Sequence, residues 1–199
     1  MTKRYLASVS ICFVLLLALL MSSPVQADEA NGANTMRLGV GLGYTFIHPE
    51  NDHAVTLYLS FQYAFASFYR MGMNGHIDYY YRPYDGYFVN HVFVFTPLWT
   101  HEFIVWRNET FELAPRLGLG YQLYYASSGW ETGDDARGIG ALGPHGLAFN
   151  FGLGFGWVIT DLLLLRFGID YGLTTLLGGG ERGFIIHQLS AGLNIVFRL

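Results

Sequence analysis

The chain has 199 residues, of which 52% are hydrophobic, 17% aromatic and 13% charged, and its formal net charge at pH 7 is −4. It contains one cysteine, which excludes a disulfide framework. The acidic balance excludes nucleic acid as the expected partner, because no basic patch is available to release phosphate counterions.

The first 27 residues have the parts of a secretory signal peptide. Lys3 and Arg4 form a basic start, residues 11–21 are an apolar run too short to span a bilayer, and small residues precede a predicted cleavage after Ala27. Cleavage would leave 172 of the 199 residues, with all fifteen acids, nine arginines, no lysine and no cysteine. Residues 28–34 are a short polar lead-in.

From residue 35 to 199 apolar residues alternate with polar or small ones, a period of two that only β-strands have. Turn residues divide this region into eight segments. The predicted strands are Thr35–Ile47, Ala54–Phe65, Phe68–Tyr81, Tyr87–Trp106, Phe111–Tyr125, Leu147–Ile159, Leu162–Thr175 and a last strand that follows Gly183 and runs to Leu199. Pro97 suggests a bulge in the fourth strand, and residues 126–146 are the one long loop.

Glycine placement distinguishes a barrel from a soluble sandwich. Of 25 glycines, twelve fall at the predicted inward positions and only Gly75 falls at an outward one. A narrow eight-stranded barrel needs small inward residues, whereas its bulky outward residues suit lipid. The predicted fold is therefore all-β, an eight-stranded antiparallel up-and-down transmembrane β-barrel. With a periplasmic N-terminus, the short turns fall in the periplasm and the four longer loops outside.

Charged residues at inward positions form the first candidate site. They should pair in the lumen, because an unpaired buried charge is costly. These residues are Arg37, Arg70, Asp78, Glu102, Glu112, Arg116, Arg166, Asp170 and Arg198. We interpret them as a structural plug of ion pairs, with a gated or very narrow pore as the functional alternative.

His76 and Asp78 are a weaker, catalytic candidate. They lie two residues apart and so share a strand face, and Ser60 and Ser190 also point inward, which makes a nucleophile–base–acid set conceivable. Such spacing is common on strands and no loop motif accompanies it. We therefore expect no catalytic site here.

The remaining histidines and aromatic residues are predicted to serve the membrane interfaces. His91, His101 and His187 point outward by parity, as do many tyrosines and tryptophans of the aromatic girdle. His48 and His53 lack a third ligand nearby, and the acids of the long loop lack the spacing of a calcium loop. No metal and no cofactor are expected.

The chain resembles the small eight-stranded outer-membrane barrels, the OmpA-like and OmpX-like group. The resemblance rests on the signal peptide, the eight alternating strands over 35–199 and a closing strand whose alternate residues are apolar, although such chains usually end on Phe and this one ends on Leu199. It implies a monomer in the cell outer membrane, inserted by the barrel-assembly machinery and surrounded by outer-membrane lipid and lipopolysaccharide.

The expected function is a non-enzymatic integral outer-membrane protein that supports the envelope or displays a surface loop. One alternative is an enzyme that modifies lipid A or phospholipid, and another is a narrow small-solute pore. Lipid A deacylase barrels carry a His-x-Ser pair on a late strand. Here Tyr171-Gly172-Leu173 and His187-Gln188-Leu189 stand instead, so that activity is not carried over.

Overall fold

The computed structural model describes residues 34–49, 51–84, 88–126, 141–177 and 185–199. The predicted signal peptide lies outside these ranges. The strands are β1 (Thr35–His48), β2 (Asp52–Ala66), β3 (Tyr69–Tyr84), β4 (Phe88–Phe103), β5 (Trp106–Arg107), β6 (Phe111–Ala126), β7 (Ala141–Thr160), β8 (Leu163–Leu176) and β9 (Ile185–Arg198).

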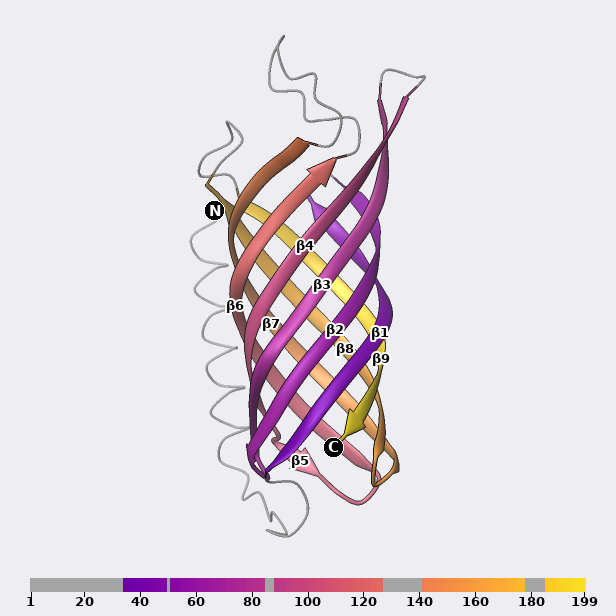
Figure 1. Cartoon of the computed structure of the whole chain (residues 1–199), viewed down its shortest axis with the longest axis vertical. Helices are drawn as coiled ribbons and strands as arrows, with labels where there is room; N and C mark the ends of the chain where they lie inside the picture. The colour runs from indigo at the N-terminus through magenta and orange to yellow at the C-terminus, as the bar shows by residue number, and fades with distance from the viewer. Residues whose placement is uncertain (1–33, 50, 85–87, 127–140, 178–184) are drawn as a thin grey trace, which may run out of the picture.

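The strands form one closed antiparallel sheet (Figure 1). Each long strand pairs with the next long strand along the chain, and β1 pairs with β9 to close the sheet. The two-residue strand β5 lies between β4 and β6 in sequence only, because β4 and β6 pair directly. The predicted eight-stranded up-and-down barrel is confirmed. We call the end where β1 begins and β9 ends the base, and the opposite end the mouth.

Two predictions about the fourth strand are wrong. The strand ends at Phe103, and Trp106–Arg107 is a separate short strand against β6. Pro97 makes no bulge, because it lies opposite Gly75 in an unbroken register with β3. The missing proline N–H affects only the other edge, where the ladder with β6 skips Thr96 and Pro97 and resumes in the same register.

The predicted long loop is too long at its C-terminal end. Residues 141–146 belong to β7, and Ala141 pairs with Ala126 at the end of β6. A register shift between Leu123 and Tyr125 accommodates one extra residue of β7 between Leu142 and His145. The first three residues of the turn predicted at residues 82–86 are likewise part of β3, which extends to Tyr84 opposite Phe88.

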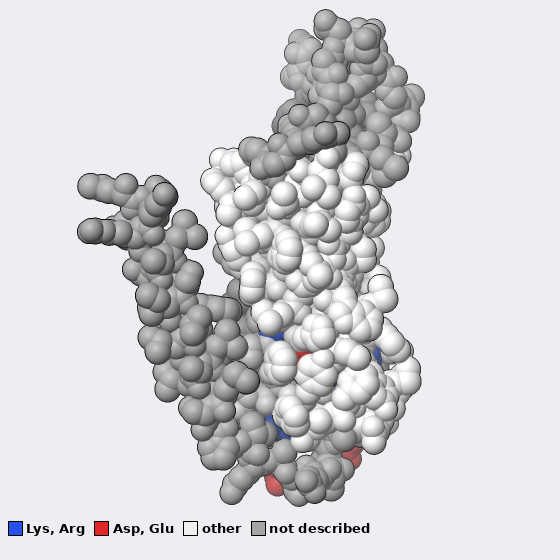
Figure 2. Space-filling model, turned by 90° about the vertical axis from the view of Figure 1, so that its left-hand side faces the viewer, with Lys and Arg blue, Asp and Glu red and all other residues white. Residues whose placement is uncertain are grey.

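The outer wall is apolar along every long strand. Large exposed side chains include Leu42 on β1, Val55 on β2, Leu193 on β9 and Phe197 near the base. Figure 2 shows that most of this face is uncharged and that the charged side chains reaching it lie toward the base. An apolar surface of this extent is stable in lipid. In the part of the chain that the structure describes, no helix has the length and apolar character to cross a membrane.

Candidate functional site: the barrel lumen

Inward glycines give the lumen room for long side chains. A Cβ atom at Gly154 of β7 would overlap the guanidinium of Arg166, and one at Gly168 of β8 would lie 2.8 Å from Nη2 of Arg116. Gly152, Gly154 and Gly168 are therefore surfaces on which arginine side chains lie. A long charged side chain has room to cross the barrel where the residue on the facing wall is a glycine without a side chain.

Glu112 of β6 is the centre of the ion pairs at the base. Its carboxylate accepts two hydrogen bonds from Arg70 (2.9 Å and 2.6 Å), two from Nη1 of Arg37 (3.2 Å and 3.5 Å) and one from Arg107 (3.1 Å). Nη2 of Arg198 lies 3.8 Å from the same carboxylate. The Glu112 side chain is 1% exposed, so these charges compensate one another away from water.

Glu102 of β4 is the second carboxylate at the base. It accepts hydrogen bonds from Arg70 at 2.7 Å, from Arg166 and from the amide of Gln62 at 3.4 Å. Five guanidinium groups thus share two carboxylates. We call this set the base layer, and its members are Arg37, Arg70, Arg107, Arg166, Arg198, Glu102 and Glu112.

Arg116 and Asp170 form a separate ion pair nearer the middle of the barrel. Nε of Arg116 donates to Oδ1 of Asp170 at 2.6 Å, and Nη2 donates to the other oxygen. This two-point contact joins β6 to β8 across the lumen and leaves both side chains buried. The structure thus brings eight of the nine predicted charged residues into ion pairs.

Asp78 is the exception. Among the described residues it has no salt bridge, and its Oδ1 accepts a hydrogen bond from Thr56 at 2.6 Å. Thr56 contacts Thr45 at 2.6 Å, and Thr45 contacts Ser190 at 2.8 Å. Asp78 lies eight residues along β3 from Arg70, about 26 Å away, so it cannot reach the base layer.

His76 is buried in the lumen wall without a catalytic arrangement around it. Its ring packs edge-on against Tyr58 at 4.8 Å between centroids. Within the described ranges, His76 has no hydrogen bond to Asp78, whose partner is Thr56, and Ser190 is bonded to Thr45. The structure therefore places the two candidates on one wall without joining them to a nucleophile.

The space beside His76 is small. A cavity of about 10 Å³ lies among polar side chains that include His76, Thr96, Asn150 and Gln188. This is about the volume of one water molecule, too little for a lipid substrate. No group of three or more metal-ligating side chains occurs among the residues that the structure describes.

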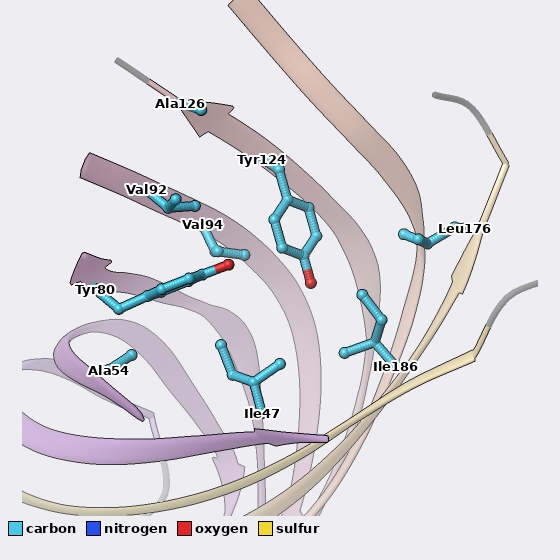
Figure 3. Close-up of a cluster of buried hydrophobic side chains, with 9 residues drawn as sticks. All are labelled: Ile47, Ala54, Tyr80, Val92, Val94, Tyr124, Ala126, Leu176 and Ile186. Carbon is cyan, nitrogen blue, oxygen red and sulfur yellow. The ribbon is translucent and has the colours of Figure 1, made fainter. Parts of the chain in front are cut away.

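Toward the mouth the lumen becomes apolar. Nine buried side chains from seven strands converge there (Figure 3). They are Ile47, Ala54, Tyr80, Val92, Val94, Tyr124, Ala126, Leu176 and Ile186, which we call the mouth cluster. The sequence pattern did not predict this cluster, because inward positions were expected to hold small or polar residues, although Ile47 shares the parity of Arg37 and Tyr80 that of Asp78. Consecutive bulky residues, as at Tyr79 to Tyr81, were the available signal.

The fold and the apolar outer wall define an eight-stranded outer-membrane-type β-barrel. Similar structures include Ail, the attachment invasion locus protein of Yersinia pestis (11% identity, 84% of this chain and 99% of that chain, TM-score 0.56). Neisserial surface protein A matches at 10% identity over 83% of this chain and 96% of that one, with a TM-score of 0.54. OprG from Pseudomonas aeruginosa matches at 12% over 85% and 97%, with a TM-score of 0.52.

These identities establish a shared fold and nothing finer. No protein-family model matches the sequence, and no curated protein matches it either. The fold and the apolar wall together support the predicted location in the cell outer membrane.

Proposed function

We propose that the protein is a non-enzymatic outer-membrane barrel, a rigid closed frame that supports the envelope and holds its mouth-side loops at the cell surface. The observation that carries this proposal is the filled lumen. The base layer closes one end, the Arg116–Asp170 pair crosses the middle, and the mouth cluster closes the other end. Eight strands enclose just enough space for such side chains, which argues against a pore.

The experiment combines bilayer recordings with mass spectra of lipid A. We expect purified protein to give no discrete openings in planar bilayers, and cells with and without the protein to have lipid A of the same acyl composition. Reproducible openings in the wild type would favour the small-solute pore. An altered acyl composition of lipid A or phospholipid would favour the lipid-modifying enzyme.

His76→Phe is the variant that identifies a catalytic role if lipid changes are found. The substitution removes the ring nitrogens and keeps a buried ring beside Tyr58. Loss of the lipid change in His76→Phe, with the barrel still folded, would assign the chemistry to this part of the lumen. The non-enzymatic role is supported if cells with the wild type, cells with His76→Phe and cells without the protein have the same lipid profile.

A further inference from the structure

Five of the chain's seven histidines contact a tyrosine on the outer wall in one repeated geometry. The tyrosine lies on a strand that runs toward the mouth. The histidine lies on the following strand, opposite the residue two positions after the tyrosine. The pairs are Tyr44–His53, Tyr69–His101, Tyr79–His91, Tyr121–His145 and Tyr171–His187.

The contacts within the pairs are specific. The tyrosine hydroxyl lies 2.7 Å from Nδ1 in Tyr69–His101, 2.8 Å in Tyr79–His91 and 2.6 Å in Tyr171–His187. Tyr44 makes the same contact with His53. In Tyr121–His145 the ring centroids are 5.9 Å apart. The hairpins β1–β2, β6–β7 and β8–β9 therefore contain one tyrosine–histidine pair each, and the hairpin β3–β4 contains two.

The pairs lie at two levels. Tyr69–His101 is near the base and the other four, which we call the mouth-side pairs, are near the mouth. Tyr69 and Tyr79 are ten residues apart on β3. At about 3.3 Å per residue and a strand tilt of about 40°, this corresponds to about 25 Å along the barrel axis, the height of the apolar band of such a barrel. The pairs thus mark both edges of the lipid-facing wall.

The mouth-side histidines offer hydrogen-bond donors at the outer edge. All the arginines whose side chains the structure describes lie in the lumen or bond to it at the base, and the one lysine of the chain is Lys3. A tyrosine hydroxyl that donates to Nδ1 fixes the neutral imidazole with its proton on Nε2. In the four pairs joined through Nδ1, the ring then offers an N–H donor on the side away from the tyrosine.

We propose that the mouth-side pairs bind the phosphate groups of lipopolysaccharide in the outer leaflet. The imidazole Nε2–H donates to a phosphate oxygen, and the tyrosine holds the ring in place. Four pairs spaced around the barrel would contact several headgroups at one depth. This inference rests on the proposed outer-membrane role with the mouth facing outward.

The test compares lipid A retained by the protein after mild detergent extraction from outer membranes. One variant carries phenylalanine at all four mouth-side histidines (His53, His91, His145 and His187), and a milder variant carries only His145→Phe and His187→Phe. Because lipid A occupies the outer leaflet, His101→Phe at the base is the matched control. Mass spectrometry measures lipid A per barrel, in cells with phosphorylated lipid A and in cells whose lipid A lacks phosphates.

We expect the wild type and His101→Phe to retain lipid A that carries phosphates. Both proteins should retain much less lipid A when it comes from cells whose lipid A lacks phosphates. Each mouth-side histidine should contribute about two- to fivefold to the affinity, so both histidine variants should retain less than the control. Equal retention by the fourfold variant and the control would overturn the proposal, as would equal retention of both lipids by the wild type. A wild-type protein missing from the outer membrane would instead overturn the proposed function.

Discussion

Replacing Glu112 by glutamine removes the charge that the arginines of the base layer share while keeping the side-chain volume. Arg70 and Arg37 each donate two hydrogen bonds to this carboxylate, and Arg107 donates one. At an effective dielectric constant of about 20, opposite charges 4 Å apart attract by about 4 kcal/mol. Removing one partner of a buried pair costs about 3–5 kcal/mol. We expect the free energy of unfolding to fall by about that amount.

The assay is urea unfolding of the barrel in lipid vesicles, followed by tryptophan fluorescence and by the electrophoretic shift of the folded form. Arg107→Gln is the control, because this guanidinium is partly exposed and makes one hydrogen bond to Glu112. Its loss should cost less than about 1 kcal/mol. If Glu112→Gln costs no more than Arg107→Gln, the shared charge of Glu112 does not stabilise the barrel.

Other substitutions test the glycines, the mouth cluster and the hydroxyl chain in the same unfolding assay. Gly154→Ala should cost about 1–3 kcal/mol because its Cβ meets Arg166. Gly75→Ala should change stability by less than about 1 kcal/mol, because its Cβ would lie at an ordinary contact distance of 3.9 Å from Leu59. Ile47→Ala should cost about 2–5 kcal/mol without making vesicles leaky to ions, because the base layer stays closed. Thr56→Val removes the hydrogen bond to Asp78 and should cost about 1.5–3 kcal/mol, and an unchanged stability would show that another group replaces it.

Strand parity predicted which side chains enter the lumen, and it did so from the sequence alone. Arg37, Glu102 and Arg166 are buried as expected, because one face of each strand must meet lipid and the other must not. Parity could not predict the partners. Arg37 on β1 reaches Glu112 on β6 across the barrel, and that meeting depends on the stagger of the closed sheet. The contact of Arg107 with Glu112 was not predicted, because Arg107 follows the predicted fourth strand and was assigned to a turn.

The tyrosine–histidine pairs show the same limit on the outer wall. Tyr44 and His53 are nine residues apart in sequence, whereas Tyr171 and His187 are sixteen apart, so no fixed spacing reveals them. They become visible only when the hairpin register is known, because a diagonal contact depends on which residues lie opposite. The outward direction of His101 and His187 was predictable, but their partners were not.

The base layer draws its members from both chain ends and from strands between them. Arg37 belongs to the first strand, Arg198 to the last, and Glu112 to a strand in the middle of the sequence. An open, half-assembled sheet in lipid would therefore leave several uncompensated charges facing hydrocarbon, at a cost of several kcal/mol each. The charges of the base layer are thus compensated only when the ring of strands is complete. Partly inserted forms of this protein are therefore higher in free energy than the closed barrel.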